Sequence, residues 1–293
     1  MSFDLDIGYA SESPGRAVNE DFVATRRPAP QEQDMGFICA VADGVSAGGD
    51  ARMAAQTSAK TLVEDYFGVP PNWDTSLALD RIIVAQNRWL AAHNRRQRSA
   101  ARGSAIASLT ALVLRGHGWV LAHVGATRAY LLREGECRQL TQDHCLEQAH
   151  SPSQRTQATR ALGQDDAIHV DHQQGELLRD DAFVLVSGGV HGNLAESRIA
   201  WLAAQGSAGL ASSGLVAAAV AAGGTDDASA LVVRVHSLAP SRLDDALRNS
   251  GQGAPPSRKN LGGIPGGRVV TARIAEPGVH QVHPTRDPAT GNF

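Results

Sequence analysis

The sequence predicts an α+β fold in which two β-sheets pack face to face and helices cover them on the outside. Short apolar runs between Gly-containing turns are typical of strands, and they occur in two groups along the chain. Ala-rich segments with apolar residues at helical spacing lie next to each group. Together these patterns favour two layers of strands enclosed by two layers of helices.

The first group of elements occupies about the first hundred residues. Alternation of Phe3, Leu5 and Ile7 with polar residues predicts a half-buried strand. The further elements that we expect are strands at 22–25 and 36–42, then helices at 50–63 and 77–95 separated by Pro70 and Pro71.

The second group begins at residue 104, where the pattern becomes that of short strands. Runs at 105–115, 119–124, 128–133 and 137–140, separated by turns that contain Gly, predict an antiparallel meander. We also expect strands at 183–186 and 230–235, with helices around 194–204 and 215–222. From residue 241 to the end the chain is rich in Gly and Pro, so we expect one domain at 1–237 and a linker or tail at 238–293.

Composition excludes several classes of protein. The 293 residues are 42% hydrophobic and 19% charged, as in ordinary globular proteins, and the net charge of -3 argues against nucleic acid or an anionic membrane as partner. Three cysteines without a CxxC spacing argue against a disulfide framework or a zinc knuckle. With no apolar stretch of about 20 residues and no signal-like start, we expect a cytoplasmic location.

The most informative stretch is the apolar run that ends at Asp43-Gly44 and is followed by a Gly pair. A carboxylate and a backbone carbonyl are oxygen ligands of the kind that Mg²⁺ or Mn²⁺ prefers. Upstream, Arg16 precedes the adjacent acids Glu20 and Asp21 at the start of a strand. Each group could be an ordinary polar turn, or the acids could be metal ligands with Arg16 as a phosphate clamp.

Three further features have two interpretations each. His144 beside Asp143 is a candidate general acid, whereas His123 on a strand is more simply a core histidine. The basic cluster is either a solvated helix end or a surface that attracts a phosphorylated substrate. It contains Arg95, Arg96, Arg98 and Arg102.

Six short motifs occur in order along residues 3–235. They are Asn19-Glu20-Asp21, Asp43-Gly44 with its Gly pair, Ala122-His123-Val124-Gly125 continuing to Arg128-Ala129-Tyr130, Leu140-Thr141-Gln142-Asp143-His144, Arg160-Ala161-Leu162-Gly163 and Gly224-Thr225-Asp226-Asp227. Together they resemble the metal-dependent protein serine/threonine phosphatases of type 2C. The resemblance implies a four-layer α/β/β/α sandwich with two antiparallel sheets, in which a centre of two Mn²⁺ or Mg²⁺ ions activates a water that hydrolyses phosphoserine or phosphothreonine.

The resemblance also assigns roles to individual residues. Asp43 would bridge the two metals, and the Gly44 carbonyl would hold the first. Glu20 and Asp226 would hold the second, with Asp21 in or just behind the ligand shell. Arg16 would clamp the phosphate of a phosphorylated protein substrate, for which a planar guanidinium is well suited.

Two positions depart from the family pattern. Family members usually carry aspartates where this chain has Ala126 and Gly188. Ala126 replaces a ligand of a third, weaker metal, and Gly188 replaces a ligand of the second metal, so we expect one or two ions and no third. Asp227 and Asp181 are nearby acids that could compensate. The chain could therefore be a weak or impaired phosphatase, a pseudophosphatase that binds phosphoproteins, or a variant engineered to trap one state.

The form of the Asp43 motif most resembles bacterial phosphatase domains fused to protein kinases. Residues 286–291 near the end resemble the start of a kinase N-lobe, and the chain stops before any kinase lysine. A serine/threonine kinase is therefore a candidate partner, and the tail is a candidate remnant of a kinase lobe.

Overall fold

The computed structural model describes residues 3–45, 50–98, 104–145 and 159–238. Several sequence-based expectations lie outside these residues: the Gly pair after Asp43, Arg102, the side chain of Arg98, and the tail from residue 239 with its kinase-like motif.

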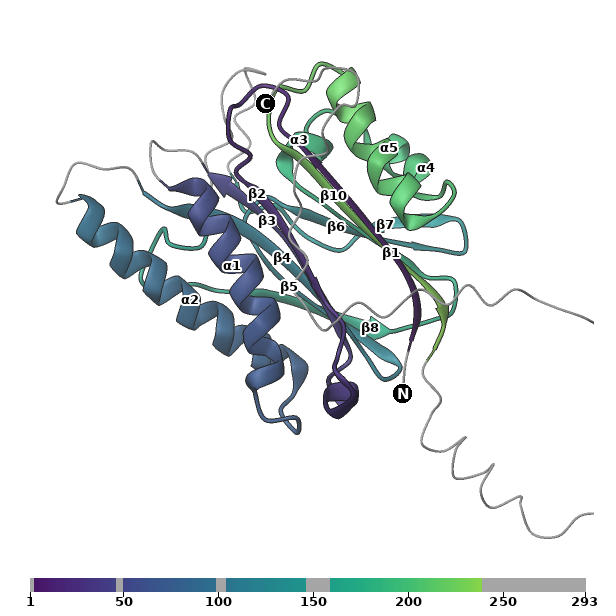
Figure 1. Ribbon diagram of the computed structural model, residues 1–293, viewed down its shortest axis with the longest axis horizontal. Coiled ribbons are helices and arrows are strands. Elements are labelled where there is room, and N and C mark those ends of the chain that lie inside the picture. The colour runs from purple at the N-terminus through teal and green to yellow at the C-terminus, as the bar shows by residue number, and fades with distance from the viewer. Residues whose placement is uncertain (1–2, 46–49, 99–103, 146–158, 239–293) are drawn as a thin grey trace, which may run out of the picture.

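The described residues form two five-stranded antiparallel sheets with helices outside them (Figure 1). The first sheet has the order β1-β10-β9-β6-β7 and the second has the order β2-β3-β4-β5-β8. The strands are β1 Asp4–Glu12, β2 Asp21–Arg26, β3 Phe37–Val45, β4 Ile106–Arg115, β5 Gly118–Val124, β6 Arg128–Arg133, β7 Glu136–Gln139, β8 Asp171–Glu176, β9 Ala182–Val186 and β10 Ala228–Ser237. The α-helices are α1 Ala51–Asp65, α2 Thr75–Arg98, α3 Gly188–His191, α4 Glu196–Ala203 and α5 Ala208–Ala221, and 3₁₀ turns span Pro30–Met35 and Tyr66–Gly68.

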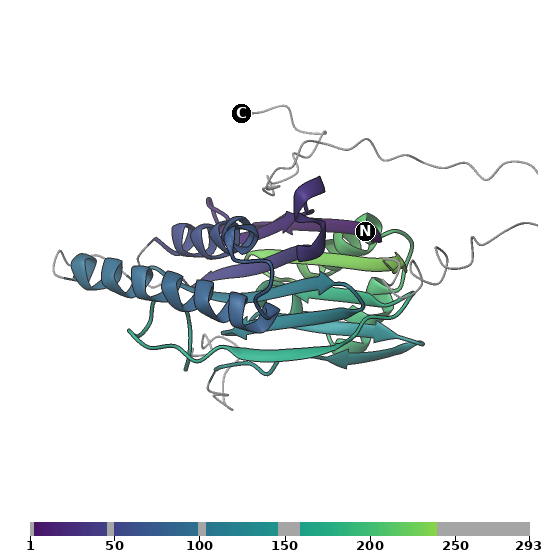
Figure 2. The same ribbon diagram turned by 90° about the horizontal axis from the view of Figure 1, so that it is seen from below.

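Helices α1 and α2 cover the second sheet, and α3, α4 and α5 cover the first (Figure 1). In the turned view of Figure 2 the strands and the long helix α2 run in roughly the same direction. The two sheets face each other across an apolar core that includes Phe37, Leu112, Phe183 and Leu231. The predicted four-layer α+β fold is confirmed.

Strand β3 shows why its sequence is continuously apolar. Ile38, Ala40 and Ala42 pack toward α1 and α2, whereas Cys39 and Val41 pack into the core between the sheets. Since successive side chains of a strand point to opposite faces, a strand covered on both faces needs apolar residues at every position. The run ends at Asp43, where the strand reaches the end of the sandwich.

The predicted meander at 105–140 is wrong, because its strands belong to two sheets. β4 pairs with β5 in one sheet and β6 pairs with β7 in the other, so the chain crosses between sheets at 125–127. Gly125 has φ +104°, which a residue with a side chain rarely adopts. The structure also adds the polar edge strand β8, which has no apolar alternation in its sequence.

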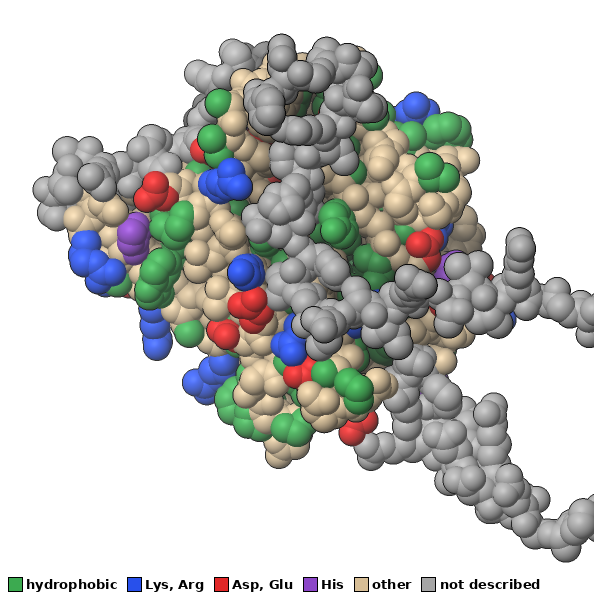
Figure 3. Space-filling view, viewed as in Figure 1, with side chains coloured by type: hydrophobic (Ala, Val, Ile, Leu, Met, Phe, Trp, Pro, Cys, Tyr) green, Lys and Arg blue, Asp and Glu red, His purple; other side chains and the backbone are tan. Residues whose placement is uncertain are grey.

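Figure 3 shows one face of the molecule. Where described residues are visible over α1 and α2, small groups of apolar side chains lie among charged ones. Trp89 of α2 is half-exposed, as single surface aromatics often are. Arg95, from the basic cluster, pairs with Asp166, which fits a solvated helix end. Within the described ranges, no helix has both the length and the apolar character needed to cross a bilayer.

We expect Gly125→Ala to lower the free energy of unfolding by about 2–5 kcal/mol, combining left-handed strain with overpacking. A Cβ at Gly125 would lie 2.7 Å from the Ser108 Cα, so backbone must move. Gly135 has φ +83° and open space around its position, so Gly135→Ala isolates the strain, at about 1–2 kcal/mol. Urea titration measures both, and equal losses would contradict the role of Gly125 as a packed crossover.

Candidate metal centre

The candidate centre lies where strand ends from both sheets meet. Asp43 of β3 lies opposite Asp21 of β2 on one side and opposite Ser108 of β4 on the other. From the first sheet, Asp226 and Asp227 immediately precede β10. The sandwich thus brings acids that are up to about two hundred residues apart in sequence to one end.

Arg16 joins the acids that come from the two sheets. Its Nη1 lies 2.5 Å from Oε2 of Glu20 and 3.2 Å from Oδ2 of Asp227, and its Nη2 lies 2.6 Å from Oδ1 of Asp226. The Arg16 side chain is only 24% exposed, so water screens these ion pairs incompletely. The guanidinium therefore neutralises part of the charge of the cluster.

Asp227 ties the loop before β10 to the loop before β2. Its Oδ2 accepts a hydrogen bond of 2.9 Å from the Glu20 backbone N–H. Its side chain is 3% exposed, whereas that of Asp226 is 57% exposed. Asp226 is therefore the more accessible acid, and Asp227 has the more structural position.

Among the described residues, several buried carboxylate oxygens have no donor at close hydrogen-bond distance, although the Ser187 and Ser229 hydroxyls lie near enough to Asp21 to lower its pKa. These oxygens are Oδ1 and Oδ2 of Asp21 and Oδ1 of Asp227. Burial, together with the nearby charge of Asp43, raises the pKa of Asp21 well above its usual value. Buried polar atoms in folded proteins are normally paired, so these oxygens are candidate sites for a cation.

Burial raises the pKa of Asp43 to about 7, with the charges of Asp226 and Asp227 acting in the same direction. The hydrogen bond from the Gly188 N–H and the charge of Arg16 oppose this shift. Like charges directly opposite each other on neighbouring strands are destabilising, so Asp21 and Asp43 need a proton or a cation between them.

Both departures from the family pattern lie beside Asp43. The Gly188 N–H donates a hydrogen bond of 2.9 Å to Oδ2 of Asp43, and a Cβ at Gly188 would lie 3.0 Å from that oxygen. The Ala126 N–H donates a hydrogen bond of 3.0 Å to the Ser108 hydroxyl, next to Asp43. Gly188 therefore contacts the Asp43 carboxylate directly, whereas Ala126 is linked to Asp43 through Ser108.

Gly44 is required by the packing of the backbone. A Cβ there would lie 2.5 Å from the carbonyl oxygen of Ala51 and 2.8 Å from that of Glu20. The Gly44 N–H donates to the Glu20 carbonyl over 3.1 Å. This close packing of backbone holds Glu20 beside the Asp43-Gly44 turn.

The family model described as Protein phosphatase 2C matches residues 11–221, which include all of these acids except the pair before β10. This chain belongs to the protein phosphatase 2C family. Over 173 residues it is 30% identical to the serine/threonine protein phosphatase PstP of Mycobacterium tuberculosis. That alignment covers 54% of this chain and 31% of PstP, so the chain spans less than a third of this relative.

Solved structures agree with the type 2C fold. The crystal structure of the Mycobacterium tuberculosis phosphatase PstP/Ppp has 26% sequence identity and a TM-score of 0.67, covering 80% of this chain and 99% of that one. The catalytic domain of PstP in complex with two manganese ions has 24% identity and a TM-score of 0.64, covering 80% of this chain and all of that one. At this identity, the second likeness shows the fold alone.

Compared with the type 2C pattern, the donor set here fits a divalent cation in part. The oxygens are hard donors, and those of Asp21 have no close hydrogen bond from the residues that the structure describes. Yet the described ranges contain no cluster of three or more His, Cys, Asp or Glu side chains with metal-holding geometry. The reason is visible in the contacts, because Arg16 separates Glu20 from Asp226 and the Gly188 N–H occupies Asp43.

His144 is buried, and both of its ring nitrogens are engaged. Nδ1 accepts a hydrogen bond from the Gly125 N–H, and Nε2 lies 2.9 Å from Oδ2 of Asp171. His123 lies beside it with a ring distance of 4.8 Å, and burial lowers its pKa to about 4. In this arrangement His144 positions the Gly125 crossover.

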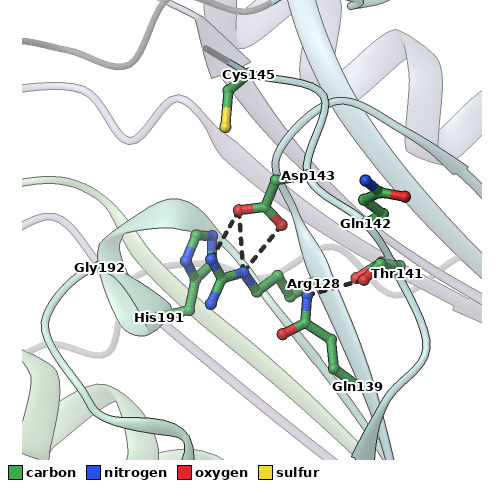
Figure 4. A pocket seen from close by; sticks show the side chains of 8 residues that line it. All are labelled: Arg128, Gln139, Thr141, Gln142, Asp143, Cys145, His191 and Gly192. Atoms are coloured by element: carbon green, nitrogen blue, oxygen red, sulfur yellow. Dashed lines mark hydrogen bonds and ion pairs between the residues drawn. The ribbon is translucent and has the colours of Figure 1, made fainter. Parts of the chain in front are cut away.

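A cavity of about 570 Å³ lies among residues of β6, β7 and α3 and of the segment that follows β7 (Figure 4). It is lined by Arg128, Gln139, Thr141, Gln142, Asp143, Cys145, His191 and Gly192. Figure 4 shows Arg128 and Asp143 facing each other, with a hydrogen bond of 2.8 Å from Nη2. His191 donates from Nε2 to the Ala126 carbonyl over 2.7 Å, so this cavity adjoins the centre.

Two residues were not anticipated, and one expectation is wrong. Ser108 could have been noticed as a polar residue in an apolar strand, whereas His191 has no sequence signal.

Asp181 cannot compensate for Gly188, because it lies at the opposite end of β9 and pairs with Arg133 over 2.7 Å. Asp227 does lie at the centre, where it binds Arg16 and the Glu20 backbone.

The raised pKa of Asp43 predicts a pH-dependent stability in metal-free buffer. Between about pH 4 and 7 the folded chain holds a proton that the unfolded chain has lost, so stability falls as the pH rises through this window. Relative to Asp43→Asn, we expect the wild type to lose about 1–3 kcal/mol of unfolding free energy between pH 4 and 8. Because Asp43 is partly exposed, water screens its charge and keeps this loss small.

Urea titrations at several pH values, with Asp65→Asn at the exposed end of α1 as control, measure the difference. Excess Mn²⁺ should remove it in the wild type. Parallel pH profiles for wild type and Asp43→Asn would contradict the assignment.

Proposed function

We propose that this chain is a protein serine/threonine phosphatase domain that depends on Mn²⁺ or Mg²⁺ and has weak or impaired activity. The observation that carries the proposal is the meeting of Asp43, Glu20, Asp226 and Arg16 at one end of a type 2C sandwich. The two manganese ions in the structure of the PstP catalytic domain support the choice of metal.

The residues of the centre have two proposed roles, which are metal binding and phosphate binding. Asp43, with the Gly44 carbonyl, would hold a divalent cation, and Asp21 lies opposite Asp43 on the neighbouring strand. Glu20 and Asp226 would contribute to a second. A bound divalent cation supplies positive charge for phosphoryl oxygens and lowers the pKa of a water. The Arg16 guanidinium can align two phosphoryl oxygens, and the Gly188 N–H orients the Asp43 carboxylate.

The reduced activity follows from the gaps at Ala126 and Gly188. Loss of an outer partner of a metal ligand typically lowers affinity or activity about 10–100-fold, and loss of a carboxylate ligand should cost at least as much. It also removes negative charge that would balance two dications. We therefore expect one or two ions and no third.

A phosphoprotein-binding pseudophosphatase is the second candidate. It is favoured by the ion pairs of Arg16 with three carboxylates, since these pairs neutralise part of the negative charge of the centre without a metal ion. Under either candidate, phosphorylated proteins are the proposed partners, including a serine/threonine kinase. We also propose a domain at 1–237, a linker or tail at 238–293 and a cytoplasmic location.

Restoring the two aspartates tests the proposal. We expect Ala126→Asp combined with Gly188→Asp to raise Mn²⁺-dependent hydrolysis of a chromogenic phosphate ester and a phosphothreonine peptide by at least about tenfold. The Asp at 188 requires the Asp43 carboxylate to turn, because its Cβ would lie 3.0 Å from Oδ2. Asp43→Ala should abolish turnover in both backgrounds.

Gln173→Glu combined with Gln174→Glu is the control for two added negative charges, since both residues are exposed on the edge strand β8. Absence of Mn²⁺-dependent turnover in the wild type and the restored protein, with phosphopeptide binding retained, would identify a binding module instead.

A further inference from the structure

Arg16 occupies the space between the acids that a second cation would need. Its two terminal nitrogens contact Glu20, Asp226 and Asp227 at 2.5, 2.6 and 3.2 Å. Glu20 and Asp226 are the two side chains assigned to the second metal, and they come from different sheets of the sandwich. A divalent ion and this guanidinium would therefore compete for the same carboxylate oxygens.

The competition is supported by the charge and burial of the cluster. Arg16 is 24% exposed and Glu20 is 16% exposed, so their attraction is stronger than that of a solvated pair. The three carboxylates in turn raise the pKa of Arg16 against the effect of its burial, so the guanidinium stays charged. With Gly188 unable to contribute a carboxylate, a second dication has fewer ligands with which to displace Arg16.

A second observation shows that Arg16 does not fill the whole centre. Asp21 is 7% exposed and Asp227 is 3% exposed. Within the part of the chain that the structure describes, both oxygens of Asp21 and Oδ1 of Asp227 lack a donor at close hydrogen-bond distance, and the Ser187 and Ser229 hydroxyls are the donors nearest to Asp21. Asp21 lies directly opposite Asp43, where β2 and β3 pair. The charges of Asp21 and Asp43 are therefore not neutralised by Arg16 alone, and they are the carboxylates that a single cation would bind.

We propose that Arg16 is the resident cation of this centre, standing in for the second divalent ion. The wild-type chain then binds one divalent ion at Asp43, and a second ion enters only when Arg16 leaves Glu20 and Asp226. This inference rests on the proposed metal-dependent function and adds to it a residue that sets how many ions are held.

The test counts Mn²⁺ by electron paramagnetic resonance and isothermal titration calorimetry in phosphate-free buffer. We expect one Mn²⁺ per wild-type chain and two per Arg16→Gln chain, with the second ion bound at least tenfold more tightly than any second ion of the wild type. Arg26→Gln is the matched control, because Arg26 is 19% exposed and pairs with Glu32 far from the centre. It should keep the wild-type count.

Thermal unfolding gives a readout that does not depend on activity. Without metal, Arg16→Gln should unfold at a lower temperature than the wild type, because three carboxylates lose their ion pair with Arg16. Excess Mn²⁺ should raise its unfolding temperature more than that of the wild type. Arg16→Lys keeps the positive charge but loses the planar guanidinium with its two terminal nitrogens. It should bind the second ion with an affinity between those of the wild type and Arg16→Gln.

Two or more tightly bound ions in the wild type would overturn the inference, and this count needs no variant that might fail to fold. One ion in both wild type and Arg16→Gln would overturn it as well, while leaving the metal-dependent function standing. No Mn²⁺ bound to either protein would contradict both.

Discussion

The mutual repulsion of five carboxylates is the constraint on which the centre depends. The β2–β3 register sets Asp21 opposite Asp43, and the β10 loop adds Asp226 and Asp227 near Glu20. Burial removes the water that would screen these charges, so the cluster needs protons or cations to persist. Arg16, the Gly188 N–H and a raised pKa at Asp43 each reduce this cost in the structure.

The fold supplies this concentration of charge by joining the two sheets at one end. The hydrogen bonds from Gly188 to Asp43 and from Glu20 to Asp227 both cross between the sheets. Hydrogen bonds to His144 and Ser108 hold the crossover at Gly125 and Ala126 in place near the centre. A shift of one sheet relative to the other would therefore change the distances between these acids, even if each strand kept its own structure. For this reason the geometry of the centre depends on how the two sheets pack against each other.

Much of the fold could be predicted from local pattern, and part of the centre could not. The continuous apolar run before Asp43 predicts a strand covered on both faces, and β3 is such a strand. The two-sheet division of β4 to β7 could not be predicted, because the switch depends on one turn at Gly125 and leaves strand patterns unchanged. β8 carries no alternation, since it is a polar edge strand. For the centre, the acids follow from the family motifs, but the placement of Arg16 among them depends on distances across the sandwich.

In this type 2C centre, which lacks two aspartates, we propose that an arginine takes the place of a metal ion. The most direct test is the position of anomalous scattering from manganese in crystals grown with excess Mn²⁺. We expect one strong site at Asp43, with Arg16 still in contact with Glu20 and Asp226. Two or more fully occupied sites, with Arg16 turned away from the carboxylates, would contradict it.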